Sequence, residues 1–317
     1  MSEVRLAEEL QKNIRALKEE VGKVIVGQED IVHQIILAIL ANGHALLIGV
    51  PGLAKTLLVH TLAQSLGLDF KRVQFTPDLM PSDILGTEIL DENRRFKFIK
   101  GPVFTNILLA DEINRTPPKT QAALLEAMQE KQVSIANHNF PLDQPFFVLA
   151  TQNPIEQEGT YPLPEAQLDR FMLALKLDYP SFEEEVQVVK NTTIGHQVDI
   201  KPVLSKEQIL AYQALVKKVP VADNVIEYAV RLVGKTRPAS KSAPELVKKY
   251  LDWGAGPRAS QNLILAAKAN ALVHGKLSPD IEDVQAVAKA ILRHRLLLNY
   301  KGEAEGFTID RIIEELL

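Results

Sequence analysis

The stretch Gly49-Val50-Pro51-Gly52-Leu53-Ala54-Lys55-Thr56 constrains the fold more than any other. Four apolar residues, 45–48, precede it, and residues 57–63 follow it with helical periodicity. A buried strand, a tight turn and a helix N-terminus in this order direct backbone N–H groups and a helix dipole at one small volume, which suits a phosphate group. We expect Lys55 to reach the β- and γ-phosphates of a nucleotide and the Thr56 hydroxyl to bind Mg²⁺.

This phosphate loop departs at one position from the pattern G-x-x-x-x-G-K-[ST], because Ala54 stands where a glycine is expected. A methyl group restricts φ, so we expect the loop to hold Ala54 in a helical conformation at the first turn of the helix. The alternative is an ordinary strand-turn-helix connection with a chance lysine. The polar residues that follow in nucleotide-binding order make that alternative unattractive.

Length and composition fit two globular domains. The chain has 317 residues, 46% of them hydrophobic, which can fill two cores. The net charge of −4 gives no bulk attraction to nucleic acid, and the absence of cysteine excludes disulfides and thiolate metal sites. The seven histidines are scattered, so we expect structural roles for them. Residues 2–20 are charged and no apolar run is longer than a strand, so we expect no membrane span and a cytoplasmic location.

Apolar strands and helical segments alternate through the first half of the chain. The strands are expected near 45–48, 71–75, 107–110, 146–150 and 172–177. This alternation favours a parallel sheet with helices on both faces, and after Tyr179-Pro180 only helices are expected. The predicted organisation is an N-terminal helix over 1–22, an α/β nucleotide-binding core over 23–180 and an all-α lid domain over 181–317.

Two short hairpins are expected as inserts in the core, near 88–99 and 132–143, the first around a turn at Asp91-Glu92-Asn93. Basic and aromatic residues mix at 94–100, which is compatible with a nucleic-acid-binding ribbon. We favour the alternative, a solvated hairpin whose alternate residues face inward.

Polar residues follow two of the predicted strands. Asp111 and Glu112 end the strand at 107–110, where ligands meet an open α/β sheet. We assign Asp111 to Mg²⁺ and Glu112 to orienting and activating the attacking water. Asn153 ends the next strand, where its amide can hold the water or a γ-phosphate oxygen. The alternative is that Asn153 only forms a turn before Pro154, which the same sequence would also produce.

Together, the motifs at 49–56 and 107–112, Asn153, Leu168-Asp169-Arg170-Phe171 and Gly256-Pro257-Arg258 resemble an AAA+ ATPase. The sequences of these motifs are similar to those of the MoxR family, a helix-2-insert clade related to magnesium-chelatase motor subunits. The resemblance extends from about Val26 to Ile312. Ala54 agrees with the MoxR motif at this position. Gly256 departs from the family's motif in the second domain, where Ser more often precedes Pro-Arg.

The resemblance implies a P-loop NTPase core followed by a helical lid, with the nucleotide between them. It implies that Asn153 is the sensor, that Arg170 is the arginine finger for a neighbouring subunit, and that Arg258 contacts the nucleotide from the lid. Guanidinium groups suit the charge spread over a transferring phosphoryl group. The alternatives are a surface ion pair for Arg170 and a solvated helix start for Arg258. Arg115 is a weaker candidate for facing a neighbour.

The predicted catalytic residues are Lys55, Glu112, Asn153, Arg170 and Arg258; the metal ligands are Thr56 and Asp111; the nucleotide-binding residues are Gly49, Val50, Pro51, Gly52, Leu53, Ala54, Lys55, Thr56 and Leu57, with Val26 and Gly27.

The resemblance implies Mg²⁺-dependent hydrolysis of ATP to ADP by a ring, expected to be a hexamer, that remodels or activates a protein complex. It also implies a partner with a von Willebrand factor A domain, and makes a nucleic-acid partner unattractive. Three alternatives remain open. They are a magnesium-chelatase-type motor subunit, a nucleic-acid-stimulated motor and a non-hydrolysing scaffold, the last opposed by the intact Asp111 and Glu112.

Overall fold

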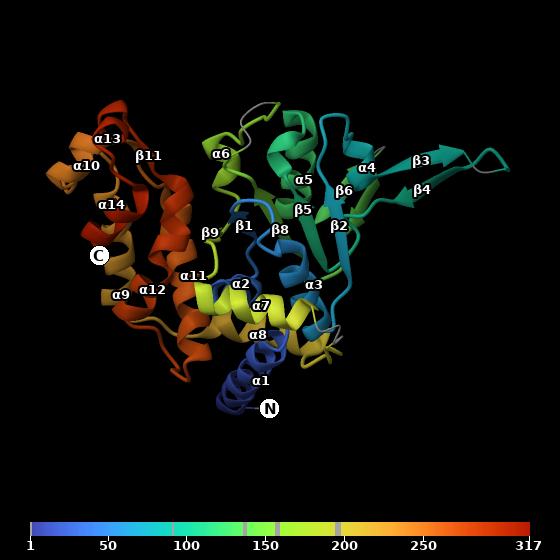
Figure 1. The fold of residues 1–317 in the computed structure, drawn as a ribbon, viewed down its shortest axis with the longest axis horizontal. Helices are drawn as coiled ribbons and strands as arrows, with labels where there is room; N and C mark the ends of the chain where they lie inside the picture. Colours follow the sequence, from blue (N-terminus) through green and yellow to red (C-terminus); the bar gives the residue numbers. More distant parts are fainter. Residues whose placement is uncertain (1, 91, 136–137, 156–158, 194–197) are drawn as a thin grey trace.

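The computed structural model describes residues 2–90, 92–135, 138–155, 159–193 and 198–317, and it shows an α/β part beside a helical part (Figure 1). The α/β part is built on a parallel sheet in the order β2-β5-β8-β1-β9. Its strands are β1 (Ala45–Ile48), β2 (Phe70–Gln74), β5 (Ile107–Asp111), β8 (Phe147–Gln152) and β9 (Leu173–Lys176). The predicted fold class is confirmed.

The inner strands β5, β8 and β1 are apolar on both sides, because both faces of the sheet are covered. Leu46 and Leu108 face one core cluster, with α4 (Pro81–Leu85) and α5 (Pro118–Glu130). Leu47 and Leu109 face the other. That second cluster includes residues of α1 (Glu3–Gly22), α2 (Glu29–Leu40) and α3 (Lys55–Ser65). Since the strands are parallel, their carboxyl ends all meet at one edge of the sheet.

The helix after β5 starts with two consecutive prolines. Pro117 is the N-cap and α5 starts at Pro118, while the hydroxyl of the preceding Thr116 donates to the carbonyl of Leu79 at 3.4 Å. A short 3-10 turn, Ile113–Arg115, fills the space between the strand and the helix.

The helical part contains α9 to α14. They are α9 (Asp223–Lys235), α10 (Glu245–Tyr250), α11 (Pro257–Val273), α12 (Ile281–Leu292), α13 (Tyr300–Ala304) and α14 (Ile309–Leu316). A capping box between Asp280 and Asp283 starts α12. A short antiparallel pair, β10 (Leu251–Trp253) with β11 (Leu297–Leu298), was not expected in this region. Among the described residues, every helix is too short or too polar to cross a lipid bilayer.

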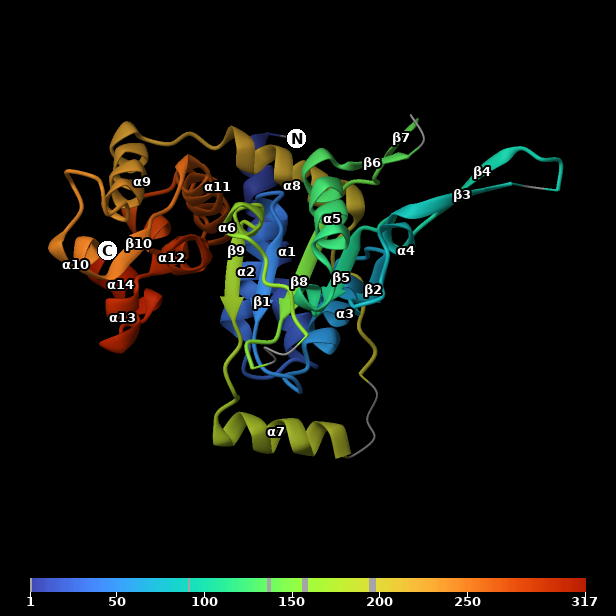
Figure 2. The same cartoon turned by 90° about the horizontal axis from the view of Figure 1, so that it is seen from above.

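Two helices that were assigned to the lid lie against the α/β part. In α8 (Lys206–Lys218), Gln213 donates to the carbonyl of Ile39 in α2 at 2.7 Å, and the hydroxyl of Tyr212 accepts from Asn13 in α1 at 2.8 Å. Helix α7 (Phe182–Thr193) lies beyond the carboxyl ends of the strands, apart from α9 to α14 (Figure 2). The boundary at residue 180 stays a prediction, and these contacts favour a later one.

Two hairpins project from the α/β part (Figure 2), β3 (Gly86–Leu90) with β4 (Phe96–Lys100) and β6 (Gln132–Ile135) with β7 (His138–Pro141). Asp91 and residues 136–137 lie outside the described residues. The expected inward alternation in the first hairpin is wrong. Phe96 is 75% exposed, and in β4 only Phe98 is partly buried, because the hairpin leaves the sheet and has no surface to cover. Phe98 stacks on Phe140 of the second hairpin, with ring centroids 4.1 Å apart.

Candidate active site

A cavity of about 440 Å³ opens at the carboxyl edge of the sheet, and we call it the loop cavity. It gathers the phosphate loop after β1, the acidic pair after β5 and Asn153 after β8. Its lining residues are Pro51, Gly52, Ala54, Lys55, Thr56, Leu57, Arg72, Asp111, Glu112, Thr151 and Asn153. All but Arg72 and Thr151 were predicted from the sequence. The strand order brings them together, since β1 and β5 both pair with β8.

Within the phosphate loop, Ala54 is in the left-handed region, with φ 54° and ψ 27°, directly before the first residue of α3. The expectation of an ordinary helical conformation is therefore wrong. A left-handed alanine costs about 1–2 kcal/mol, and such strain is typical of loops held by their surroundings at a functional site. Gly49 has a packing reason, because a Cβ there would lie 2.9 Å from the Cβ of Leu177.

Lys55 is half-buried, and its ammonium donates to the carbonyl of Gly49, so it lies across the mouth of its own loop. Burial lowers the pKa of Lys55, and the negative charges of Asp111 and Glu112 oppose that shift. A lysine held by a backbone carbonyl and facing two carboxylates can bridge to a phosphate that enters the loop.

Asp111 holds two kinds of partner. The hydroxyl of Thr151 donates to its Oδ1 at 2.6 Å, and the guanidinium of Arg72 donates to its Oδ2 at 3.0 and 2.7 Å. The Thr56 hydroxyl lines the same cavity. Hydroxyl and carboxylate oxygens are the donors that Mg²⁺ prefers, so this set fits the ion. Arg72 supplies positive charge to the carboxylate in this structure.

Glu112 is also left-handed, with φ 57°, which turns its side chain out of the strand direction. Its backbone N–H donates to the hydroxyl of Thr151 at 2.8 Å. Its Oε2 accepts from Gln74 at 2.6 Å and from Arg115 at 2.9 Å. Thr151 thus holds both acidic residues, and the carboxylate of Glu112 is fixed from two sides.

Asn153 is buried at the end of β8. Its Oδ1 accepts from the backbone N–H of Ile155 at 3.1 Å, which fixes the orientation of the amide. The Nδ2 group is then the part of the side chain that can donate to a ligand in the loop cavity. The turn-forming and ligand-binding interpretations of Asn153 are therefore compatible.

Arg170 and Arg258 lie together, and neither lines the loop cavity. They lie in a second cavity of about 260 Å³, which we call the arginine cavity. Arg170 is in the turn 169–172 between α6 (Glu165–Leu168) and β9, which we call the arginine turn. Its guanidinium makes no hydrogen bond or ion pair within the part of the chain that the structure describes. Arg258, at the start of α11, donates to Oδ2 of Asp169 at 3.3 Å.

A third, smaller cavity of about 120 Å³ adjoins the phosphate loop and contains Val26. It shares Gly52, Ala54 and Leu57 with the loop cavity. Its lining residues are Val24, Ile25, Val26, Gln28, Gly52, Leu53, Ala54, Leu57, Pro180, Val188, Asn191 and Thr192. Gly27 lies beside it with φ 71°, and a Cβ there would clash with the carboxyl group of Glu184 in α7. Helix α7, and no residue of α9 to α14, thus forms the outer wall among the described residues.

The comparisons with known proteins identify the family to which the chain belongs. The family model described as "ATPase family associated with various cellular activities (AAA)" matches residues 44–173, and the one described as "AAA lid domain" matches 243–316. The chain is 45% identical to the chaperone MoxR1 of Mycobacterium tuberculosis over 94% of this chain and 79% of that protein. The chain belongs to the MoxR family of AAA+ ATPases.

Two further proteins are similar to the chain over most of its length. The uncharacterized protein YeaC of Bacillus subtilis is 45% identical over 94% of this chain and 91% of its own length. A crystal structure of a candidate ATPase from Cytophaga hutchinsonii is 46% identical, with a TM-score of 0.92 over 98% of this chain and 95% of that one.

Sequence reasoning missed Arg72 and Thr151 in this MoxR-family site. Arg72 lies in the predicted strand at 71–75, but only the pairing of β2 with β5 brings it beside Asp111. Thr151 stands two residues before Asn153 at the end of β8. A polar residue at the end of an otherwise apolar strand was the available sign for Thr151. The residues around Arg72 in the sequence do not distinguish it from a basic residue exposed to solvent.

Proposed function

We propose that this chain is a Mg²⁺-dependent ATPase that works as a ring and uses hydrolysis to remodel a protein complex. One observation carries the proposal. The loop cavity holds the lysine and both carboxylates, whereas Arg170 and Arg258 lie outside it in the arginine cavity. Within one chain the only guanidinium lining the described loop cavity is that of Arg72, which is bonded to Asp111, so the two arginines predicted to suit a phosphoryl transition state can reach such a site only in a neighbouring subunit.

Within the loop cavity each side chain has a separate task. Backbone N–H groups of the phosphate loop and Lys55 hold the phosphates, and Thr56 and Asp111 would hold Mg²⁺, which neutralises charge on the phosphate oxygens. Glu112, fixed by Gln74 and Arg115, accepts a proton from the attacking water and orients it. The amide of Asn153 holds that water or a γ-phosphate oxygen without adding charge.

The arginine cavity has the composition of an anion site. Its described lining includes Lys131, Arg170 and Arg258 and contains no acidic residue. Asp169, outside the lining, pairs with Arg258, and a bound anion would neutralise the remaining positive charge of the cavity. We infer that the anion is the γ-phosphate end of a nucleotide held by the next subunit. Arg258 then acts on the neighbour's nucleotide, beside Arg170, and not on the nucleotide of its own chain.

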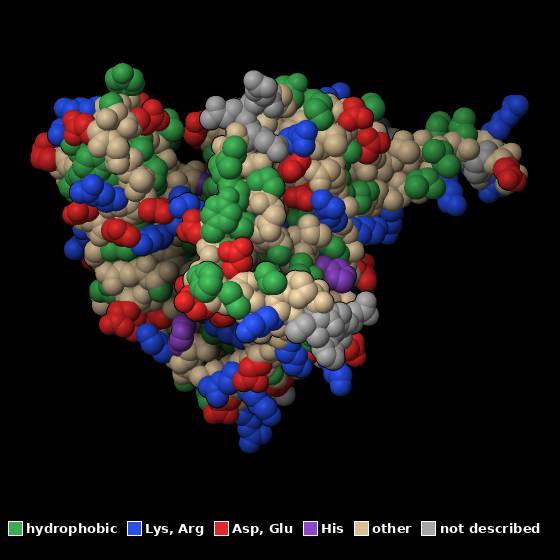
Figure 3. Space-filling view, viewed as in Figure 1, with side chains coloured by type: hydrophobic (Ala, Val, Ile, Leu, Met, Phe, Trp, Pro, Cys, Tyr) green, Lys and Arg blue, Asp and Glu red, His purple; other side chains and the backbone are tan. Residues whose placement is uncertain are grey.

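The projecting hairpin offers a surface for a protein client. Apolar side chains are exposed along it (Figure 3), among them Ile89, Leu90, Phe96 and Ile99. Exposed apolar patches mark interaction sites, and the name of the relative MoxR1 describes that protein as a chaperone. Stacking of Phe98 on Phe140 links this hairpin to β6–β7, so the two hairpins can move together. A partner with a von Willebrand factor A domain stays a prediction from the family resemblance.

Two alternative functions use the same ATPase site. A magnesium-chelatase-type motor would bind a porphyrin-handling partner subunit. A nucleic-acid-stimulated motor is favoured by the basic residues of the first hairpin. That alternative predicts DNA-stimulated hydrolysis that declines in Arg95→Ala and Lys97→Ala, and its absence would remove this alternative.

The test of the proposed function is ATP turnover per subunit against protein concentration, with mass measured by light scattering on the same samples. Turnover that rises as larger assemblies form supports a site shared between subunits. Constant turnover from a species that stays monomeric would show that each chain is self-sufficient, and the ring motor would be abandoned.

A further inference from the structure

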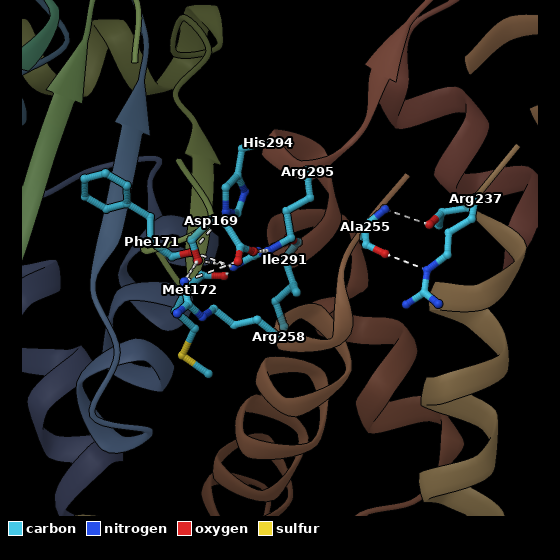
Figure 4. A network of polar contacts seen from close by, with 10 residues as sticks. Asp169, Phe171, Met172, Arg237, Ala255, Arg258, Ile291, His294 and Arg295 are labelled. Atoms are coloured by element: carbon cyan, nitrogen blue, oxygen red, sulfur yellow. Dashed lines mark hydrogen bonds and ion pairs between the residues drawn. The ribbon is translucent and has the colours of Figure 1, made fainter. Parts of the chain in front are cut away.

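In the tripeptide Arg293–Arg295, which follows α12 in the helical part, His294 and Arg295 hold the arginine turn of the α/β part (Figure 4). Arg295 donates to the carbonyls of Asp169 at 3.2 Å, Phe171 at 2.7 Å and Met172 at 3.2 Å. Nε2 of His294 lies 3.0 Å from the same Phe171 carbonyl, and since a carbonyl can only accept, His294 donates this hydrogen bond. Three of the four carbonyls of this turn are therefore held from the helical part of the chain.

Arg295 is a buried charge with a full set of partners. Its side chain is 2% exposed, and its Nε donates to Oδ1 of Asp169 at 2.7 Å. It also donates to the carbonyl of Ile291 within α12, so the guanidinium is bonded to the helical part as well as to the arginine turn. Burial lowers the pKa of Arg295, and Asp169 opposes that shift. The planar guanidinium fork makes several directed bonds at once, which a lysine ammonium cannot reproduce.

Arg170 lies between the residues that Arg295 holds. The carbonyls at 169, 171 and 172 flank it, while its own guanidinium makes no hydrogen bond or ion pair among the described residues. The direction in which Arg170 leaves the backbone therefore depends on the arginine turn, which in turn depends on Arg295. Asp169 is shared further, since its Oδ2 also accepts from Arg258 at 3.3 Å.

We propose that Arg295 is a positioning residue that ties the placement of Arg170 to the helical part of the chain. Arg295 does not touch the nucleotide. It aligns the arginine turn so that Arg170 reaches a neighbour's site, and a shift of α12 moves that turn with it. The proposal rests on the proposed role of Arg170 in trans, and it identifies the contact through which the lid regulates the shared site.

The test uses Arg295→Lys, which keeps the charge and removes the fork. Misplacement of a catalytic group by about 1 Å can cost 100-fold, so we expect turnover to fall about 10- to 100-fold. KM for ATP and the Kd of ADP should stay within about threefold of wild type, because Arg295 does not line the loop cavity. Arg170→Ala combined with Arg295→Lys should be no slower than Arg170→Ala alone, because Arg295 acts through Arg170.

Subunit mixing separates positioning from general damage. When Arg295→Lys chains are mixed with Glu112→Gln chains, the second kind supplies a well-placed Arg170 to the intact Glu112 of the first, and turnover should recover. A fold defect would not be repaired in this way. The matched control is Arg293→Lys, whose guanidinium holds Ala174 in β9 and Asp310 in α14. It also crosses between the two parts but not at the arginine turn, so its turnover should fall less than about threefold.

Three outcomes would overturn the proposal: wild-type turnover in Arg295→Lys when Arg170→Ala is impaired, no recovery on mixing, or additive defects in the double variant. Wild-type turnover in Arg170→Ala would instead reject the proposed function itself. If Arg295→Lys does not fold, Asp169→Asn replaces it, because Asn keeps one oxygen that can accept from Arg295, loses the charge, and has an amino group in place of the oxygen that accepts from Arg258. The same pattern of unchanged KM and recovery with Glu112→Gln is then expected.

Discussion

Two inactive variants of this chain should regain activity when they are mixed. Glu112→Gln keeps the phosphate loop and Arg170 but loses the base, and general-base loss costs about 10²- to 10⁴-fold in turnover. Arg170→Ala keeps Glu112 but withdraws the guanidinium, which costs about 10³- to 10⁵-fold where a finger is lost. Both should bind ADP as wild type does, because Arg170 does not line the loop cavity and a glutamine side chain keeps the shape of the glutamate that it replaces.

The size of the recovery follows from the separation of the two cavities. A working site needs an intact Glu112 from one chain and an intact Arg170 from its neighbour. If fractions f and 1 − f of the two variants assemble at random, the working fraction is f(1 − f), which peaks at about one quarter at equal mixing for a head-to-tail ring. The assay is phosphate release at constant total protein across mixing ratios.

The control replaces Glu112→Gln with the double variant Glu112→Gln, Arg170→Ala, which can supply neither group and should give no recovery at any ratio. Activity that stays at the weighted sum of the two single variants, with rings confirmed by light scattering, would refute the placement of Arg170 in a neighbour's site.

Single residues elsewhere in the chain lead to three more predictions. Ala54→Gly removes left-handed strain of about 1–2 kcal/mol but adds freedom to the unfolded chain worth about 0.4–1 kcal/mol, so a small net gain in unfolding free energy is expected by urea titration; a loss would show that the methyl group makes a contact that outweighs the strain. Burial lowers the pKa of His44 to about 4 in the folded chain, while its Nδ1 accepts from the N–H of Val148. Protons therefore bind His44 better in the unfolded chain between about pH 6.5 and 4, so His44 by itself should contribute about 2 kcal/mol to the stability lost between pH 7 and 5. That part of the loss should be absent from His44→Asn, and equal pH dependence in both proteins would contradict this. Gln28 donates to the carbonyl of Leu53 at 3.3 Å, and its buried Oε1 has no partner among the described residues. Because Gln28 and the predicted nucleotide-binding residue Val26 line the same cavity beside the phosphate loop, we predict that this oxygen accepts from the amino group of adenine. Gln28→Met should narrow the preference for ADP over IDP about tenfold, whereas Gln34→Met, which lies outside the cavities of the loop, should not; an unchanged preference in Gln28→Met would exclude this contact.

Local patterns were enough to predict much of the nucleotide site. The phosphate loop, the acidic pair after β5 and Asn153 are each marked by an apolar strand directly before or near them, and parallel strands bring their carboxyl ends to one edge. The lining of the loop cavity by these residues agrees with that reasoning. The choice of roles for Glu112, Arg170 and Arg258 stays a prediction; for the two arginines it came from the family resemblance.

Local patterns failed where a distant surface decides the environment. The first hairpin has inward and outward positions in its sequence, but its projection away from the sheet leaves Phe96 exposed. Its position at the first turn of a helix predicted a helical conformation for Ala54. Closure of the loop requires a positive φ there, which the neighbouring residues in the sequence do not indicate. Helices α7 and α8 have the same amphipathic character as the lid helices, and only their packing partners distinguish them.

Hydrophobic periodicity and turn chemistry act over a few neighbouring residues, so the amino-acid sequence was sufficient for the alternation of strands and helices, the phosphate loop and the residues that end each strand. Packing of the whole chain then selected which of those residues meet. The sheet order placed Arg72 beside Asp111, and the docking of α12 placed Arg295 on the arginine turn, 126 residues away in the chain. Contacts of that span depend on how whole elements pack against one another, and no local pattern encodes them.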